Sequence, residues 1–455
     1  MTNAPLYQAL NTLLNQRFTQ NVNVLEHHSK DESWHSSCAP QGVCYPHNTE
    51  EVSEIIKLCA QYQTPITAFG AGTSVEGQSI PSANSLCIDL SEMDQIVDIN
   101  IQDLNCRVQA GVTRQQLNDS AQRQGLFFPI DPGANATIGG MCATRASGTN
   151  AVRYGTMKDN VLSLKAVMAN GDIIETGTQA RKSAAGLDLT SLLIGSEGTL
   201  AIITEITLKL HGIPDTIAAA QLPFSELGDA TEFVTQVLQS GIPIARIELL
   251  DDVQINAVNA YNQMDLPETP TLFLEFHGSE AAVREQVDSV QAIAATLTPY
   301  PFAWSTLQEE RNQLWKARHQ ALYAAKQLVA NARVWTTDVC VPISKLSECL
   351  LATKKDLDEA GLLAPIVGHV GDGNFHTLMV LPEGDHAAEA SAKAVNQKMI
   401  ERAVAMGGTC TGEHGIGIGK KAALQFQHAD TLPLMKQIKQ ALDPNDLLNP
   451  GKLYV

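Results

Sequence analysis

The chain has 455 residues, which exceeds the length at which a single hydrophobic core stops growing, so two domains are expected. Apolar residues make up 44% and charged residues 18%, which is typical of a globular protein and excludes a disordered or fibrous one. The formal net charge of −18 argues against binding to nucleic acid, which requires clustered Lys and Arg. Nine cysteines, odd in number and without a CxxC pair, predict free thiols in a reducing compartment.

The sequence shows no signal for export or for membrane insertion. Residues 1–21 are polar and helix-like, without the apolar stretch of a secretory signal. No run of about 20 apolar residues predicts a transmembrane segment. We therefore expect a cytoplasmic protein, and leave open a peripheral contact with the inner face of a membrane.

Residues 1–210 mix helices and strands without regular βαβ alternation. Apolar side chains at helical spacing predict a helix over 49–62. A second helix is expected at 114–124, and strands at 65–69, 86–90, 107–110, 162–169, 172–176 and 200–210. Asn170-Gly171 predicts a hairpin between two of these strands. The order of elements indicates an α+β domain.

The sequence changes character after His211-Gly212-Ile213-Pro214, and we place a domain boundary there. Helices are expected at 281–297 and 346–357, and strands at 271–276, 337–342, 364–367 and 377–381. Together these elements predict an antiparallel sheet of ferredoxin-like type, covered by helices.

One glycine-rich segment of the second half, residues 368–376, carries two histidines. Strands are expected on both sides of it, and Asp372-Gly373 is the signal of a two-residue type I′ turn. That turn sets residue 371 opposite 374, 370 opposite 375, and His369 opposite His376. Directly paired Cβ atoms lie roughly 4.5–5.5 Å apart. Two imidazoles at that spacing can reach one ion at about 2.0–2.1 Å from each nitrogen.

A second glycine-rich segment, residues 409–417, supplies Glu413 and His414. Two His and one Glu with open coordination positions are typical of a catalytic metal site rather than a structural one. We therefore expect a divalent metal ion on His369, His376 and Glu413. The alternative is a pair of turns with satisfied histidines. Zn²⁺, Mn²⁺ and Fe²⁺ all remain open, because sites of this kind accept several ions.

Three segments rich in small residues cluster in the first domain: residues 69–74, 131–155 and 195–204. The first follows an expected strand, so its backbone N–H groups and hydroxyls could cradle a pyrophosphate. It lacks the third glycine of the GxGxxG fingerprint, where Val75 stands, and it has no P-loop lysine. An ordinary turn is the alternative for the first segment alone. Three such segments in one domain imply a long ligand that approaches the backbone closely.

In combination these segments resemble a known family. The three small-residue segments and Asn449-Pro450-Gly451-Lys452-Leu453 are similar to the FAD-binding domain of vanillyl-alcohol-oxidase-type flavoproteins. Residues 368–376 and 412–420 resemble the C-terminal FAD-linked oxidase domain of 2-hydroxy-acid dehydrogenases. Residues 337–342 and 410–417 look most like the cytochrome-linked D-lactate dehydrogenases of that group.

The resemblance implies an α+β fold with four parts. Residues 1–37 are a helical segment, 38–214 a two-subdomain PCMH-type FAD-binding domain, 215–420 the ferredoxin-like cap or substrate domain, and 421–455 a return to the FAD domain. It also implies that FAD lies extended across the first domain. The expected FAD contacts are Phe69, Gly70, Ala71, Gly72, Thr73, Ser74, Asp131, Pro132, Gly133, Thr137, Thr144, Ser147, Glu197, Gly198, Ile203 and Asn449.

Family members with covalent flavin carry a His on the pyrophosphate loop, where this chain has Thr73-Ser74. We therefore expect FAD to be bound non-covalently. The resemblance implies that His414 contacts the substrate and acts as base, and that Arg318 binds the substrate carboxylate. Arg suits a planar carboxylate through bidentate bonding. The alternative for Arg318 is an exposed helix cation.

Two departures from the family pattern bear on the substrate. Members specific for D-2-hydroxyglutarate have an Asn where this chain has Leu378, and a family Lys is replaced by Thr336. Because this chain lacks both polar groups, we expect a substrate whose own side chain is short or apolar. The expected reaction is oxidation of D-lactate, or a similar D-2-hydroxy acid, to the 2-oxo acid, such as pyruvate.

Several alternatives stay open at this point. A glycolate or D-2-hydroxyglutarate dehydrogenase of the same family is the first, and a non-catalytic flavin- or metal-binding protein belongs to a different class. A UDP-sugar-type reductase shares the FAD fold but needs no metal triad. The sequence does not distinguish a cytochrome, a quinone or another electron acceptor, and it leaves a homodimer open.

Overall fold

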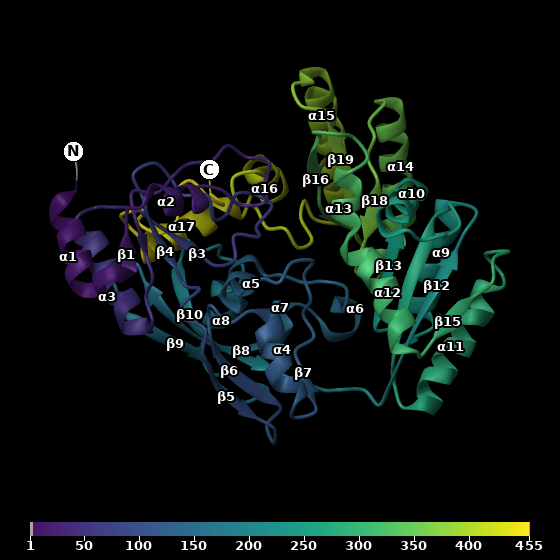
Figure 1. The fold of residues 1–455 in the computed structure, drawn as a ribbon, viewed down its shortest axis with the longest axis horizontal. Helices are drawn as coiled ribbons and strands as arrows, with labels where there is room; N and C mark the ends of the chain where they lie inside the picture. The colour runs from purple at the N-terminus through teal and green to yellow at the C-terminus, as the bar shows by residue number, and fades with distance from the viewer. Residues whose placement is uncertain (1–2, 455) are drawn as a thin grey trace. The chain divides into compact units, whose positions relative to one another are not determined.

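The computed structural model describes residues 3–454, which form two compact units (Figure 1). Unit 1 holds residues 3–147, 155–213 and 413–454, and unit 2 holds residues 148–154 and 214–412. The chain therefore leaves unit 1 after Ser147 and after Ile213, and re-enters it at Gly155 and at Glu413. Residues 413–420, which the sequence assigned to the second domain, lie in unit 1.

The first sheet of unit 1 has the strand order β1-β2-β4-β3. Its strands are β1 (Phe18–Thr19), β2 (Val43–Cys44), β3 (Ile66–Phe69) and β4 (Leu86–Asp89). The β2–β4 and β3–β4 pairs are parallel, and β1 is antiparallel to β2. Helix α3 (Thr49–Gln61) begins after Asn48, whose side chain accepts a hydrogen bond from Glu51 N, and it buries an apolar face as expected. Helix α1 (Ala4–Leu14) precedes β1 in the chain, and α2 (Val22–His27) lies between β1 and β2.

The second sheet of unit 1 is antiparallel, in the order β5-β6-β10-β8-β9. Its strands are β5 (Ile96–Asn100), β6 (Asn105–Gln109), β8 (Val161–Met168), β9 (Ile173–Gly177) and β10 (Ala201–Lys209). The hairpin predicted at Asn170-Gly171 joins β8 to β9, with Gly171 at φ +85°. A two-stranded sheet pairs β7 (Leu126–Phe127) with β11 (His211–Gly212). The helices here are α4 (Arg114–Gln122), α5 (Ile138–Thr144), α7 (Met157–Asn160) and α8 (Leu189–Leu193).

The C-terminal segment returns to unit 1, as expected. After α16 (Lys421–Gln427) and α17 (Leu432–Leu442), Leu448 forms a parallel bridge with Ile66 on β3. Asn449 N then donates to Ile66 O at 2.7 Å. Leu448 and Asn449 therefore extend the first sheet beside β3.

Unit 2 is built on an antiparallel sheet in the order β15-β12-β14-β13-β18-β19-β16, with β17 also paired to β19. Its strands are β12 (Thr216–Pro223), β13 (Arg246–Leu250), β14 (Thr271–Gly278), β15 (Ala303–Ser305), β16 (Arg333–Thr336), β17 (Val339–Cys340), β18 (Ile366–Gly368) and β19 (Asn374–Leu381). This confirms the antiparallel sheet covered by helices.

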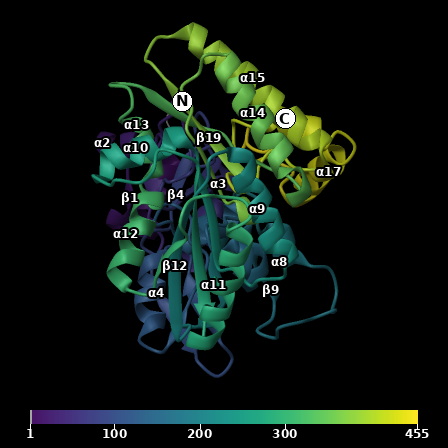
Figure 2. The same ribbon diagram turned by 90° about the vertical axis from the view of Figure 1, so that its right-hand side faces the viewer.

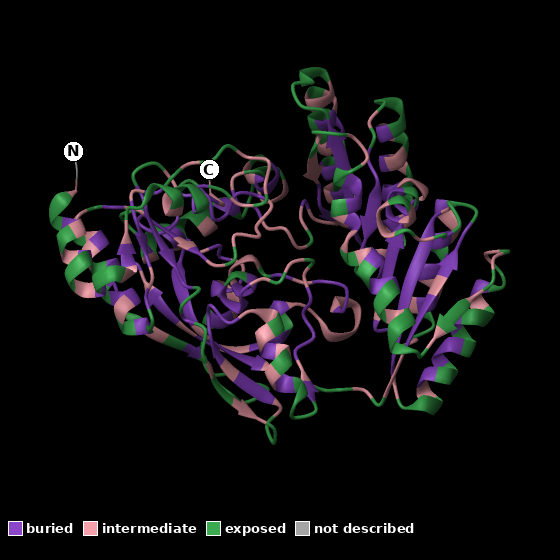
Figure 3. Cartoon of the chain, viewed as in Figure 1, coloured by how far each residue is buried: buried purple, intermediate pink, exposed green. Residues whose placement is uncertain are grey.

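The helices of unit 2, with the exception of α6, each contain buried apolar residues (Figure 3). They are α6 (Ala151–Tyr154), α9 (Leu227–Gln239), α10 (Asp252–Asn262), α11 (Glu280–Ala294), α12 (Gln308–His319), α13 (Ala321–Lys326), α14 (Leu346–Glu359) and α15 (His386–Ala405). One core cluster joins α10, α12 and α13 to the sheet through Leu250, Phe273 and Leu378. Elsewhere α9 packs against α11 and α14, and α14 against α15 (Figure 2).

The strand expected at 337–342 is wrong in its bounds. The sequence pattern missed β16 (Arg333–Thr336), and only Val339–Cys340 of the expected strand pairs, as β17. Both short strands pair with β19, and Asp338 lies between them with its side chain hydrogen-bonded to Asn374 and Thr411. The interruption at Asp338 follows from these side-chain contacts, which no local pattern encodes.

The hairpin register expected at 364–381 is also wrong. Val367 pairs with His376 and Ile366 with Thr377, so the register differs by two residues from the expected one. Residues Val370–Asp372 form a 3-10 turn, and only Gly373 has the left-handed backbone, at φ +76°. The type I′ turn is displaced because β17 packs on the loop: Val341 N donates to Gly373 O at 3.0 Å. A Cβ on Gly373 would lie 2.0 Å from Val341 O, so this close approach requires glycine.

Candidate active site and cofactor-binding segments

His369 and His376 lie close together on one face of the unit 2 sheet, although they are not directly paired. A register change of one residue would move a side chain to the opposite face, but a change of two keeps it on the same face. The two rings are therefore still neighbours, with centroids 5.5 Å apart and planes at 83°. Both residues are buried. The proximity that the sequence predicted is confirmed, while the pairing that was to produce it is not.

Glu248 on β13 contacts both His369 and Arg318. One carboxylate oxygen, Oε1, lies 2.8 Å from His369 Nδ1. The other, Oε2, lies 2.8 Å from both Nε and Nη2 of Arg318 on α12. Glu248 is 1% exposed and was missed by the sequence analysis. The available signal was a charged residue within the apolar strand Ile247-Glu248-Leu249-Leu250, because buried charges are rare unless they are paired.

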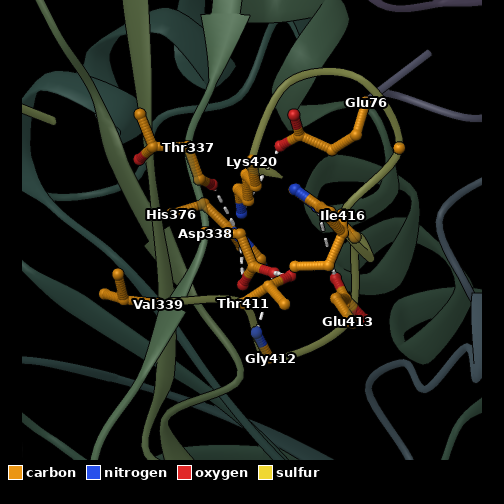
Figure 4. Close-up of polar contacts among 12 residues, drawn as sticks. Glu76, Thr337, Asp338, Val339, His376, Thr411, Gly412, Glu413, Ile416 and Lys420 are labelled. Atoms are coloured by element: carbon orange, nitrogen blue, oxygen red, sulfur yellow. Dashed lines mark hydrogen bonds and ion pairs between the residues drawn. The ribbon is translucent and has the colours of Figure 1, made fainter. Parts of the chain in front are cut away.

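His376 has a buried carboxylate beside it as well (Figure 4). Its Nδ1 lies 3.1 Å from Thr337 O and 3.5 Å from Asp338 Oδ1. Asp338 is fully buried and accepts hydrogen bonds from Thr411 Oγ1 at 2.6 Å and from Gly412 N at 2.8 Å. One aspartate therefore connects His376 to the residues that directly precede Glu413 in the chain.

These contacts fit two histidines that bind a metal ion. A carboxylate or a carbonyl at Nδ1 accepts the N–H there, which leaves the lone pair on Nε2. Carboxylate–histidine pairs of this kind orient metal-binding imidazoles and raise their basicity. His369 has such a partner in Glu248, and His376 has Thr337 O and Asp338. The donor set of the two histidines is therefore suited to a divalent ion.

Glu413 and His414 are the first residues of the last segment of unit 1. Ser147 Oγ donates to Glu413 Oε2 at 2.8 Å, and Gln78 Nε2 donates to His414 O at 2.7 Å. His414 Nε2 lies 3.8 Å from Glu413 Oε1. Ser147 itself is the last residue before the chain first leaves unit 1. One hydrogen bond thus joins two of the four points at which the chain crosses between the units.

The carboxylate of Glu197 holds the residues that follow His414. It accepts hydrogen bonds from Ile416 N at 2.6 Å and from Gly417 N at 2.8 Å. Burial of this carboxylate raises its pKa, and the two backbone donors oppose that effect. The contacts explain why residues 413–420 pack in unit 1. They also mean that the Glu197 side chain anchors this loop.

The residues expected to contact FAD all lie in unit 1, and several of their segments contact one another there. A Cβ on Gly70 would lie 2.4 Å from Thr137 Oγ1, so the 69–74 loop approaches the 131–137 segment as only glycine allows. Glu197 N donates to Ala143 O at 2.8 Å, and Asn449 Nδ2 donates to Glu197 O at 2.8 Å. Segments from distant parts of the chain are thus held together in unit 1.

Two global features bear on the location of the protein. Among residues 3–454 no helix combines the length and the apolar character needed to cross a bilayer. All nine cysteines are free.

Two protein-family models match the chain. The model described as "FAD binding domain" matches residues 40–177, and the one described as "FAD linked oxidases, C-terminal domain" matches residues 174–453. "Probable D-lactate dehydrogenase, mitochondrial" of Danio rerio is 48% identical over 434 residues, which are 94% of this chain and 87% of that protein. "D-lactate dehydrogenase [cytochrome], mitochondrial" of Arabidopsis thaliana is 44% identical over 451 residues, 98% of this chain and 80% of that protein.

The fold itself is found among solved structures. 4-Ethylphenol oxidase from Gulosibacter chungangensis, solved with isoeugenol, matches 99% of this chain and 97% of its own with a TM-score of 0.82. Its sequence is only 15% identical, so the likeness concerns the fold alone.

Proposed function

Because the chain belongs to the FAD-linked oxidase family, we propose that it is a dehydrogenase that oxidises D-lactate, or a similar short D-2-hydroxy acid, to the 2-oxo acid. It is an FAD-dependent oxidoreductase of the D-lactate dehydrogenase type. The single observation that carries the choice of substrate class is the cluster formed by the buried His369, His376 and Glu248 with the partly buried Arg318 of α12. It combines a metal-type histidine pair with a cation for a carboxylate.

We infer that the metal site consists of His369, His376 and Glu413. The assignment of Glu413 is supported by its position in the chain, directly after Gly412. Asp338 accepts a hydrogen bond from Gly412 N and lies 3.5 Å from His376 Nδ1. Consecutive Cα atoms are about 3.8 Å apart, so Glu413 follows directly on a residue that is fixed next to His376. Two histidines and one carboxylate leave coordination positions for a substrate.

Each remaining residue has a defined task in the proposed reaction. Bound FAD and a divalent ion would supply a hydride acceptor at flavin N5 and a Lewis acid for the hydroxyl, respectively. The Arg318 guanidinium binds the substrate carboxylate and so orients the C2–H bond. His414, next to Glu413, removes the hydroxyl proton. FAD is held non-covalently, since Thr73-Ser74 on the pyrophosphate loop offer no histidine for attachment.

The proposed function also requires an electron acceptor. The proposed electron acceptor is a cytochrome, a quinone or another carrier. Both relatives are mitochondrial by name, which does not support the cytoplasmic location expected from the sequence.

The test is an anaerobic spectrum of the purified yellow protein during titration with D-lactate and then L-lactate. D-Lactate should bleach the flavin band and L-lactate should not. Glycolate and D-2-hydroxyglutarate, tested in parallel, should reduce the flavin with lower kcat/KM. A preference for either of them would overturn the assignment to D-lactate. A protein that no 2-hydroxy acid reduces would favour a non-catalytic flavin- or metal-binding role.

A further inference from the structure

Glu248 joins two side chains that the proposed function assigns to different parts of the reaction. His369 would bind the metal ion, and Arg318 would bind the substrate carboxylate. The carboxylate of Glu248 contacts both at 2.8 Å, one through each oxygen. It lies on β13 and is 1% exposed, so water does not compete for either contact.

If Glu248 is ionised, its contacts define where its two partners carry protons. An ionised carboxylate is solely an acceptor, so both partners must donate to it. His369 therefore carries its proton on Nδ1 and keeps Nε2 as the ligand nitrogen. Arg318 directs its Nε and Nη2 edge at Glu248, which leaves Nη1 and the second N–H of Nη2 for other acceptors. One carboxylate thus fixes the tautomer of a histidine and the rotation of a guanidinium.

We propose that Glu248 is a positioning residue that couples metal affinity to substrate affinity, an inference that rests on the proposed function. It holds His369 in the tautomer that binds a divalent ion and holds Arg318 in the orientation that receives a carboxylate. Loss of the carboxylate therefore weakens both. Glu248 touches neither the substrate nor the reacting atoms and acts through its two partners.

The neighbouring strand provides a matched control. Glu275 on β14 is also buried, and it also has a histidine and an arginine as partners: His277 Nε2 lies at 2.8 Å and Arg246 Nε at 3.4 Å. Arg246 in turn stacks on the ring of Trp315, 4.6 Å from its centroid. Glu275 thus reproduces the burial, charge and partner types of Glu248 with a different histidine and a different arginine.

The informative change is Glu248→Gln, which keeps the shape of the side chain. An amide has one accepting oxygen, so it can satisfy only one of the two donors and turns its NH₂ group toward the other. If the NH₂ group faces His369, the ring must accept at Nδ1, and its proton moves to Nε2, the ligand nitrogen. If it faces Arg318, the guanidinium loses its acceptor and its orientation. In either case Glu248→Gln should change Mn²⁺ affinity or KM, whereas Glu275→Gln should change neither.

The experiment uses the FAD-loaded protein, stripped of metal by a chelator, with Mn²⁺ as the probe. If its NH₂ group faces His369, Glu248→Gln should bind Mn²⁺ about 10–100-fold more weakly than wild type, as is usual when such a partner of a metal-binding histidine is lost. If the NH₂ group faces Arg318, KM for D-lactate should rise instead. FAD content and Tm should stay close to wild type in either case. Glu275→Gln should keep both the Mn²⁺ affinity and KM. ¹⁵N NMR of the histidine ring in metal-free protein should show Nδ1–H at His369 in wild type.

The outcomes separate this inference from the proposed function. If wild type binds Mn²⁺ and is reduced by D-lactate, unchanged Mn²⁺ affinity and KM in Glu248→Gln would overturn the role of Glu248 alone. Equal losses in Glu248→Gln and Glu275→Gln would also overturn it, since they would reflect general packing. If no 2-hydroxy acid reduces wild type, the proposed function fails, and the Mn²⁺ titration and the NMR tautomer still decide whether Glu248 positions His369.

Discussion

Thr336 on β16 is the direct cross-strand partner of Leu378 on β19. These are the two positions at which the family resemblance places a Lys and an Asn for a second substrate carboxylate. Directly paired side chains lie roughly 4.5–5.5 Å apart at Cβ, so the two replaced groups would act on the same point. In this chain Leu378 belongs instead to the apolar core that packs against α12 and α13.

This pairing predicts that Thr336→Lys with Leu378→Asn shifts the preference toward dicarboxylic 2-hydroxy acids. The ratio of kcat/KM for D-lactate to that for D-2-hydroxyglutarate should fall relative to wild type. An Asn at the buried position should also cost roughly 1–3 kcal/mol of stability, because its amide is desolvated there. Leu378→Met, which conserves volume, is the control and should keep the wild-type ratio. An unchanged ratio in a folded double variant would contradict the prediction.

FAD should leave the protein on denaturation. No histidine stands on the 69–74 loop, so acid or heat precipitation should release the flavin into the supernatant, where its absorbance is measured. Flavin that stays with the precipitated chain would show a covalent bond. The proposed contacts at Gly70 can be tested by Gly70→Ala, since its Cβ would lie 2.4 Å from Thr137 Oγ1. This variant should purify with less FAD than wild type.

Substitutions at Glu413 and His414 should separate metal binding from base catalysis. Glu413→Ala should lose metal and activity together, as should His369→Ala and His376→Ala, while FAD stays bound in unit 1. His414→Ala should keep both metal and FAD and lose roughly 10²–10⁴-fold in the rate of flavin reduction. The loss should appear in kcat more than in KM, because proton removal matters in the transition state.

Metal content, flavin content and anaerobic reduction rate of these four variants provide the measurement. Normal metal in all three ligand variants would refute the proposed triad. A reduction rate near that of wild type in His414→Ala would remove this residue as the base. Because Ser147 donates to Glu413, Ser147→Ala serves as a milder change in the same contact and should keep the metal.

Asp251 makes the stability of unit 2 depend on pH. It caps α10, with Oδ1 accepting from Gln254 N at 2.8 Å, and its complete burial raises its pKa from 3.8 to about 7. The native state therefore favours the protonated form. The stabilisation is fully present below the unfolded-state pKa of 3.8 and is lost as the pH rises through about 7.

Asp251→Asn should flatten this dependence. Asn is an equally good cap residue and does not ionise, so the variant should gain on the order of 4 kcal/mol over wild type above pH 7. Denaturant unfolding of both proteins between pH 4 and pH 8 measures the difference. Curves that stay parallel across this window would show that Asp251 does not titrate as its burial implies.

Local signals in the sequence determined much of this protein. Helix α3 follows from apolar residues at helical spacing, and the β8–β9 hairpin follows from Asn170-Gly171, because both depend on interactions within a few residues. The glycine-rich segments and their resemblance identified the family, which the comparisons confirm. The prediction that His369 and His376 lie together also held. The expected hairpin register was wrong by two residues, but an even shift leaves the side chains on the same face, so the two histidines remain neighbours.

Tertiary contacts decided the rest. The expected type I′ turn at Asp372-Gly373 is absent, and Val341, which directly follows β17, packs against Gly373 there. Glu248 and Asp338 became partners of the two histidines only because strands distant in the chain adjoin in the sheet. A buried carboxylate must find donors wherever the fold brings them, and the sequence shows the carboxylate but not its neighbours. The sequence therefore determined the family and its candidate metal ligands, whereas the tertiary structure decided which side chains orient the histidines and Arg318.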